Sequence, residues 1–488
     1  MAKILVHLHP RMSFLLKSIE LGDQLGGTNE YIILAGPCMQ MFAISRFYKY
    51  LIKNKRDLES ITGKKIYLKR IRFIELLPYL YRAILYFFLP AKCAMPPQSL
   101  GFASIDSIVR KRWSYLYLFS IPVLRSFFEW THLVWGLSLT SYYKDFINKN
   151  SIELSILSHS TYVSYVSLIE AAIALQKAAI AIGDSVDILI TRRQEIYHAR
   201  RVVKSLSERA LIRLRRSKPE SEVAPPISLL GYNSFSRPST YHANTPPKRA
   251  LLIMPHCFKD CNHLGKPSMM LYKTYFDWLV STVITLTTRK SLFDTIIFKV
   301  HPHAERYQDL TLMKLLGWTI FLGKNRKKFI FIDEKNNPSD KVCNLLRGHS
   351  ITAVTVHGSS ALEYSTQGVG SISAGEPITD VGAVCVPKSV PDYKNMLLLP
   401  ALSASKVVLD QDIVNSCRRI MESFALLKAP NALQNIIGEM DEYFYFGITS
   451  RPVDEGLHAL LVGLRTRMDP FFIQTPDGND LIGYKQKI

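Results

Sequence analysis

A histidine–proline pair in the second half of the chain suits the binding of an anionic ligand. His301-Pro302 follows Thr295 to Val300, an apolar run typical of a buried strand. In an open parallel sheet, the carboxyl end of a strand faces the ligand crevice. A histidine there can donate a hydrogen bond to a phosphate group or assist a leaving group. We therefore predict that His301 and Lys299, on the same strand end, contact a phosphorylated ligand, and that His301 also takes part in catalysis.

A second motif, His357-Gly358-Ser359-Ser360, follows the apolar run Ile351 to Val356. Gly358 permits a close approach of the backbone, and the two serines offer hydroxyl and N–H groups where a helix begins. The helix dipole favours an anion at that end. Ser359 can also cap the helix while Glu363 closes a capping box, and both roles can hold together. We predict that these residues, from His357 to Glu363, bind the phosphorylated ligand.

The segment from Pro255 to His263 is rich in titratable side chains. Asp260 is a candidate catalytic base or nucleophile, and the remaining alternative is a loop without chemistry. His256 and His263 are candidates for contact with a sugar or an acceptor. A zinc site built from these histidines with Cys257 and Cys261 matches no common module, so no metal is expected.

Two further strand ends are candidates for sugar or acceptor contact. Gly375 and Glu376 follow the short predicted strand Gly370 to Ser373. His159 and Tyr162 follow Ile152 to Leu157, in the first half of the chain. A plain turn and a helix cap explain the same residues without a ligand, so both interpretations stay open here.

The elements that position these residues alternate between strand and helix, which is typical of a parallel sheet. We expect an α/β protein with two Rossmann-like lobes, a ligand cleft between them and extra helices in the N-terminal region. Further strands are predicted at Ala178–Ile182, Ala250–Met254 and Phe329–Asp333, and helices at Tyr162–Lys177, Val202–Arg216, Lys273–Thr288, Ser360–Gln367 and from Asp412 onward. The predicted domains are an N-terminal acceptor-binding lobe (1–224), a linker rich in Pro, Ser and Asn (225–249), a C-terminal nucleotide-binding lobe (250–410) and C-terminal helices (411–488) that cross back to the first lobe.

The first half of the chain is strongly basic. Residues 1–250 contain 35 Lys and Arg against 17 Asp and Glu, so +18 of the total formal charge of +21. Two apolar stretches, Leu76–Pro90 and Trp113–Leu139, are expected either to form buried helices or to dock on the inner face of a membrane, beside basic flanks. The basic residues are dispersed and form no known nucleic-acid module, so no nucleic-acid partner is expected.

Composition agrees with a folded protein that keeps its thiols reduced. The chain of 488 residues is 48% hydrophobic and 21% charged, and its seven cysteines have scattered spacing. The first ten residues read as a strand and not as a signal peptide. We therefore expect a cytoplasmic protein at the inner face of the cytoplasmic membrane.

The order of these motifs resembles that of bacterial GT-B-fold glycosyltransferases that build capsules and lipopolysaccharide. The sequence PHxFxDxxH after a strand is followed by KxHP, by HGSSALEYxxxG and by AGxP, from Met254 to Gly382. The resemblance spans roughly residues 152–390. It implies that the second lobe binds a nucleotide sugar and the first lobe an acceptor. It also implies that His301, Ser359 and Ser360 bind the nucleotide phosphate, as in sialic-acid and Kdo transferases, that Glu363 lies near the ribose, and that no metal or other cofactor is needed.

The function expected from this resemblance is transfer of a sugar to a cell-surface polysaccharide or lipid-linked glycan. The donor is a nucleotide sugar, with CMP favoured over UDP and GDP, and an anionic membrane surface is a further candidate partner. One alternative is a CDP-polyol phosphotransferase of the teichoic-acid type, and another is a non-catalytic glycan-binding scaffold. The sugar, the acceptor, the linkage and the oligomeric state are left open.

Overall fold

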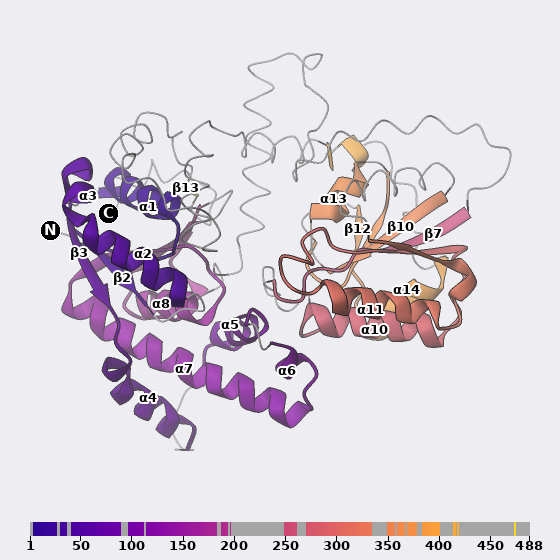
Figure 1. Cartoon of the computed structure of the whole chain (residues 1–488), viewed down its shortest axis with the longest axis horizontal. Coiled ribbons are helices and arrows are strands. Elements are labelled where there is room, and N and C mark those ends of the chain that lie inside the picture. Colours follow the sequence, from indigo (N-terminus) through magenta and orange to yellow (C-terminus); the bar gives the residue numbers. More distant parts are fainter. Residues whose placement is uncertain are drawn as a thin grey trace, which may run out of the picture. The chain divides into compact units, whose positions relative to one another are not determined.

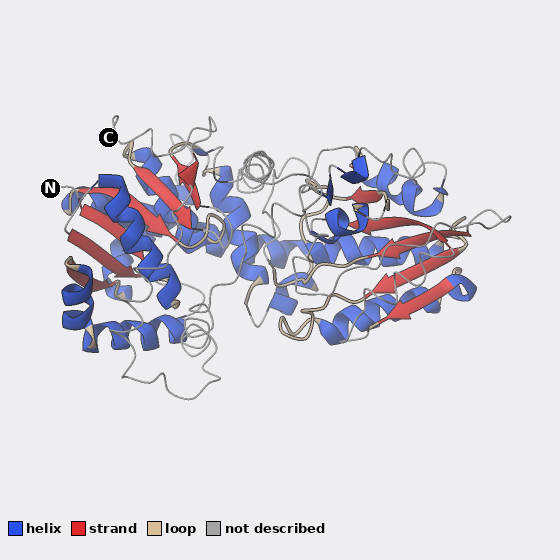
Figure 2. Ribbon diagram, turned by 90° about the horizontal axis from the view of Figure 1, so that it is seen from above, coloured by secondary structure: helices blue, strands red, loops and turns tan. Residues whose placement is uncertain are grey.

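The computed structural model divides the chain into two compact units (Figures 1 and 2). Unit 1 comprises residues 1–202 and 429–488, and unit 2 comprises residues 203–428. The predicted basic helix from Val202 to Arg216 and nearly all of the predicted linker lie outside the described residues. The structure describes residues 3–26, 30–36, 41–88, 96–111, 114–182, 187–193, 196, 248–260, 270–333, 349–356, 359–366, 368–377, 383–400, 413–415, 417–418 and 473–474.

Unit 1 is built on a seven-stranded sheet with the order β13-β6-β5-β4-β1-β2-β3. All neighbours are parallel except β5 and β6, which pair antiparallel. Read from β3, the order 3-2-1-4-5-6 is that of a dinucleotide-binding sheet, and the chain reverses direction across the sheet between β1 and β4. The strands are β1 (Lys3–His7), β2 (Glu30–Ala35), β3 (Lys65–Arg70), β4 (Ile152–Leu157), β5 (Ala178–Ile182), β6 (Asp187–Ile190) and β13 (Ile473–Gln474).

Unit 1 has many helices beyond those of a plain doubly wound sheet. The 28-residue α7 packs against α4, α5 and α8, and Figure 1 shows it running below the sheet with α4 beneath it. These extra helices confirm the expectation of a helical N-terminal addition. The helices are α1 (Met12–Gly26), α2 (Met41–Lys53), α3 (Lys55–Thr62), α4 (Phe73–Phe88), α5 (Gln98–Val109), α6 (Ser114–Leu118), α7 (Pro122–Lys149) and α8 (Val163–Ala174).

Unit 2 contains a six-stranded, fully parallel sheet with the order β12-β11-β10-β7-β8-β9. This order is again 3-2-1-4-5-6 when read from β9, with the switch point between β7 and β10. Figure 1 shows α10, α11 and α14 on one face and α13 on the other. The elements are β7 (Lys248–Ile253), α10 (Tyr275–Thr288), β8 (Thr295–Lys299), α11 (Leu310–Phe321), the 3-10 helix η4 (Arg326–Lys328), β9 (Phe329–Ile332), β10 (His349–Thr355), α13 (Ser359–Ser365), β11 (Ser371–Ser373), β12 (Val384–Cys385) and α14 (Val390–Leu398).

Apolar runs explain why the parallel strands at the centre of both sheets are buried. In β1, β2, β5 and β8 all residues or all but the first are buried, and so are the last four residues of β7, because helices cover both faces of such a sheet and leave no polar side. The two units confirm the expected fold class of two Rossmann-like lobes. The predicted strands Ile152–Leu157 and Ala178–Ile182 correspond to β4 and β5 with the same bounds.

One segment differs from its expected secondary structure. The chain from Asp412 onward was expected to be helical, and residues 413–415 and 417–418 are helical. Ile473 and Gln474 instead form β13, which pairs in parallel with Asp187 and Ile188 of β6. A strand that joins the edge of a sheet almost 300 residues away gains its hydrogen bonds from that sheet, and local helical periodicity carries no trace of such a partner.

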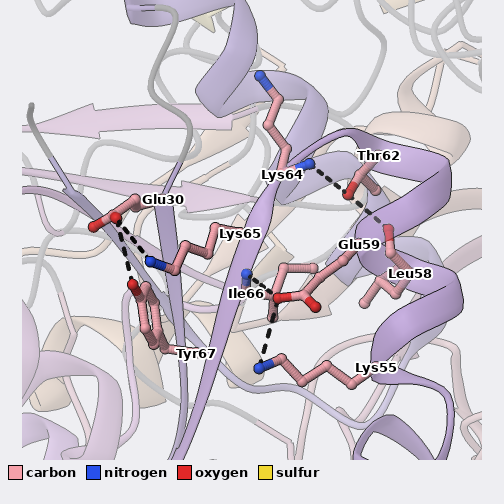
Figure 3. A network of polar contacts seen from close by, with 9 residues as sticks. All are labelled: Glu30, Lys55, Leu58, Glu59, Thr62, Lys64, Lys65, Ile66 and Tyr67. Carbon is pink, nitrogen blue, oxygen red and sulfur yellow. Dashed lines mark hydrogen bonds and ion pairs between the residues drawn. The ribbon is translucent and has the colours of Figure 1, made fainter.

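The turn between α3 and β3 is held by side chains as well as by the backbone (Figure 3). The Glu59 carboxylate accepts a hydrogen bond from the Ile66 backbone N–H at 2.8 Å and pairs with Lys55 at 3.6 Å. The Thr62 hydroxyl donates to the Leu58 carbonyl at 2.7 Å. Gly63 ends the helix in the left-handed region, with φ 65°, and its N–H donates to the Glu59 carbonyl at 2.9 Å.

We predict that Gly63→Ala destabilises the protein by about 1 kcal/mol, because an L residue in the left-handed region is strained. A Cβ at Gly63 would meet no atom within 4 Å, so the backbone conformation alone sets this cost. Gly101→Ala is the matched control: Gly101 lies inside α5, and a Cβ there also meets no atom within 4 Å. This variant should be about 0.5–1 kcal/mol more stable than the parent. Urea unfolding of the three proteins measures both changes, and equal signs would contradict the assignment.

Candidate functional site

The histidine–proline pair of unit 2 lies where the sequence predicted, directly after β8 and next to the first strand of the sheet, β7. His301 Nδ1 lies 3.1 Å from Cys257 Sγ, and the backbone N–H of His303 donates to the same nitrogen at 3.1 Å. Because Nδ1 accepts this N–H, a neutral His301 ring carries its proton on Nε2. The ring is thereby held as a hydrogen-bond donor through Nε2.

The surroundings of His301 keep it neutral. Burial, together with the neighbouring imidazoles of His256 and His303, lowers the pKa of His301 to about 3, although Asp260 acts in the opposite direction. The ring centroids of His256 and His301 are 5.5 Å apart. At neutral pH His301 is therefore an uncharged donor, which suits contact with a phosphate oxygen better than proton transfer from an imidazolium.

His256 and Asp260 lie together on the loop that follows β7. His256 Nδ1 is 3.8 Å from Asp260 Oδ2, and the His256 ring stacks on Tyr275 at 4.6 Å between centroids. A hydrogen bond anchors this loop: the Lys259 backbone N–H donates to the buried Asp309 carboxylate at 3.2 Å. The structure thus brings three predicted residues, His256, Asp260 and His301, to one edge of the sheet.

Lys299, which is predicted to contact the phosphate, is buried beside Tyr364. Its side chain is 8% exposed, and its Nζ donates to the Tyr364 hydroxyl at 3.1 Å and lies 5.3 Å from the centre of the Tyr364 ring. Tyr364 belongs to α13, which follows β10. This contact joins β8 to the helix of the second predicted motif.

The other predicted residues of unit 2 occupy the next strand ends. Ser360 and the buried Glu363 lie on α13, and Gly375 and the buried Glu376 follow β11. The Gly375 backbone N–H donates to Ser373 Oγ at 3.4 Å, and Ser373 Oγ itself donates to the Val356 carbonyl at the end of β10. His263, His357, Gly358 and the side chain of Ser359 lie outside the described residues.

Unit 1 has its own histidine cluster, at the switch point between β1 and β4. His159, which is exposed, follows β4 and stacks on Tyr165 at 5.3 Å between centroids. His9, after β1, lies 5.4 Å from the His159 ring. His7 is fully buried, and its Nε2 lies 3.1 Å from the Tyr143 hydroxyl.

The two buried histidines of this cluster are held neutral. Burial lowers the pKa of His7 to about 4. Burial holds the pKa of His9 well below its usual value, and the nearby His159, Arg11 and His7 lower it further. His159, a predicted acceptor residue, therefore belongs to a cluster with His7 and His9, which were predicted only as part of a strand.

A signal for the two missed residues was present. His9-Pro10 follows a buried strand in the same way as His301-Pro302 does. The backbone at Gly36, after β2, approaches the cluster so closely that a side chain there would collide with it. A Cβ at Gly36 would lie 2.6 Å from His7 Nε2 and 2.9 Å from the Tyr143 hydroxyl. The predicted Tyr162 is the N-cap residue of α8, and its ring lies 5.6 Å from that of His159.

A pocket of about 590 Å³ lies in a different part of unit 1, and none of these histidines lines it. It is bounded by the first three strands, α4 and the C-terminal end of α7. Its lining residues are Lys3, Ile32, Tyr67, Lys69, Glu75, Tyr79, Tyr142, Asp145, Phe146, Lys149 and Asn150.

No family model and no curated protein matches the sequence. Among solved structures, the chain is similar to S. aureus MnaA in complex with UDP, with 12% identity, 93% of this chain and 100% of that chain covered, and a TM-score of 0.27. It is also similar to the apo form of the lipopolysaccharide outer core galactosyltransferase WaaB, with 9% identity, 87% and 98% coverage and a TM-score of 0.30. These scores are too low to carry an argument, so the fold assignment rests on the strand orders of the two sheets.

Proposed function

We propose that the protein is a glycosyltransferase that takes its sugar from a nucleotide-sugar donor, with unit 2 binding the donor and unit 1 the acceptor. The observation that supports this most is the position of His301: a neutral imidazole with its proton on Nε2, at the carboxyl edge of a sheet whose order is that of dinucleotide-binding proteins. Negative charge builds up on the leaving phosphate as the sugar–oxygen bond breaks. A fixed N–H donor stabilises that charge.

Asp260 is the proposed catalytic carboxylate of the same edge. It lies 3.8 Å from His256, so an acceptor hydroxyl that approached the pair could pass its proton to the carboxylate.

His159, with its ring exposed and the Ser158 hydroxyl 2.7 Å from its Nδ1, is the proposed acceptor contact in unit 1. The acceptor is proposed to be a growing cell-surface or lipid-linked glycan, and the protein is proposed to act at the inner face of the cytoplasmic membrane.

A panel of nucleotides tests the donor class. We expect one of CMP, UDP and GDP to bind at least about tenfold more tightly than the other two, with CMP as the first candidate, because a base-specific pocket discriminates by hydrogen bonds that the wrong base leaves unpaired. Isothermal titration with each nucleotide measures this difference. Hydrolysis of the matching nucleotide sugar, followed by mass spectrometry of the product, then separates sugar transfer from transfer of a phosphorylated polyol. Equal weak binding of all three nucleotides would contradict the proposal.

A further inference from the structure

The helices added to unit 1 expose large apolar side chains that the sheet and its core do not use. On α4, Phe73, Ile74, Leu77 and Tyr81 are 44–70% exposed and lie on one face of the helix. A second group surrounds the turn between α6 and α7. It consists of Leu116, Phe119, Ile121, Val123, Leu124 and Phe127, which are 49–74% exposed. The two groups together are called the apolar surface below.

Both groups belong to one packed helical layer. Phe127 stacks on Trp130 at 6.1 Å, and Trp130 contacts Phe87 of α4 at 6.0 Å between ring centres. Phe73 stacks on Trp135 of α7 at 6.4 Å. Figure 1 shows α4 alongside α7 and α6 at the first turn of α7. The apolar surface is thus carried by α7 and by α4 and α6, which both pack against it.

The segment of the sequence that contains most of the apolar surface is strongly basic. Residues 64–125 contain eleven Lys and Arg against two Asp and Glu, a net charge of +9. Arg72 and Arg82 flank the apolar face of α4 and are exposed. Of the two acidic residues in this range, Glu75 is paired with Lys69 at 2.8 Å and Asp106 is buried. Just beyond the range, Glu129 accepts a hydrogen bond from the Tyr117 hydroxyl at 2.6 Å. Positive potential is therefore left beside exposed aromatic and aliphatic side chains.

We propose that the apolar surface docks on a bilayer that contains anionic phospholipids, with the rings of α4 and of the α6–α7 turn in the headgroup region. Basic residues beside aromatic and aliphatic side chains are the combination that interfacial helices use, since lipid phosphates pair with the former and acyl chains cover the latter. Within the described residues, no helix is long and apolar enough to cross a membrane. The docking acts through side chains laid on the surface and does not depend on the proposed transferase activity.

Vesicle co-sedimentation of the full-length protein tests the proposal. The parent should bind vesicles of phosphatidylcholine mixed with phosphatidylglycerol at least about thirtyfold more tightly than vesicles of phosphatidylcholine alone. Phe119→Ser combined with Phe127→Ser should weaken binding to the anionic vesicles by at least about a hundredfold, because two rings lose their apolar contact. Arg72→Gln combined with Arg82→Gln should lower it by about thirtyfold and reduce its sensitivity to salt.

The matched control is Leu315→Ser combined with Leu322→Ser on α11 of unit 2 and just after it, where the two leucines are 62% and 80% exposed. This variant should bind vesicles like the parent. Equal binding of the parent to both vesicle types, or no binding, overturns the proposal. So does concentration-dependent dimerisation in light scattering that the Phe119 and Phe127 variant abolishes, because a second copy would then be the occupant. Thermal unfolding confirms that each variant is folded before its binding is compared.

Discussion

Replacing His301 by alanine should weaken binding of the donor nucleotide by about tenfold to a hundredfold, the range expected for one hydrogen bond to a charged group. The transfer rate should fall further, by roughly a hundredfold to a thousandfold, because the His301 N–H stabilises negative charge that develops as the phosphate leaves. Isothermal titration and initial rates with the matching nucleotide sugar separate these two losses.

The proton position on His301 makes this prediction sharper. Glutamine places its amide near the position of Nε2 and asparagine near that of Nδ1. Since Nδ1 accepts the His303 N–H at 3.1 Å, the useful donor is Nε2, so His301→Gln should keep more activity than His301→Asn. His303→Ala is the control: its side chain is exposed, and its backbone N–H remains in place. If His301→Ala binds every nucleotide as the parent does, the site assignment is wrong.

Acidification should destabilise the protein between pH 6.5 and pH 4, and His7 should supply a large share of this loss. Its pKa is about 4 in the folded protein and 6.5 when exposed. Between these values the unfolded chain binds a proton that the folded chain does not, so the free energy of unfolding falls as the pH falls. The share of His7 is about 2 kcal/mol between pH 7.5 and pH 5.

Urea unfolding at pH 7.5 and pH 5, followed by circular dichroism, measures this loss. His7→Gln removes the titrating ring, so the difference between the two pH values should shrink by about 2 kcal/mol. Tyr143→Phe is the matched control. It removes the hydroxyl that lies 3.1 Å from His7 Nε2 and should lower stability at both pH values. The His7 imidazole stays in place, so most of the pH dependence should remain. An unchanged pH dependence in His7→Gln would assign the acid sensitivity to other groups.

Much of the fold could be predicted from local patterns. The strands β4 and β5 and the helices α8 and α10 correspond closely to the predicted segments, because a buried parallel strand needs an unbroken apolar run and a helix needs an apolar stripe. The location of His301 at a strand end follows from the same reasoning. The positions of these strands, helices and strand ends depend on neighbours within a few residues, so they can be predicted from the sequence.

The apolar stretches of the first half show where local patterns stop. Their helical form was predicted, but periodicity alone did not decide between a buried and a membrane-docking role. In the structure Leu76 is buried while Leu77 is 44% exposed on the same helix. Which side of α4 meets α7 depends on aromatic contacts such as Phe73–Trp135, between residues 62 positions apart.

The amino-acid sequence alone thus specified the α/β class, the strands β4, β5 and β7 to β11, the helices α8, α10 and α13, and the strand ends that carry His301, His159 and Asp260. Folding in three dimensions decided the rest: the 3-2-1-4-5-6 order of both sheets, the addition of β13, and the approach of His9 to His159, with His7 and His159 both against Tyr165. The reason is physical. The order of the strands and the approach of side chains to one another depend on contacts between segments about 100 to 290 residues apart, and such contacts leave no periodicity in the chain between them.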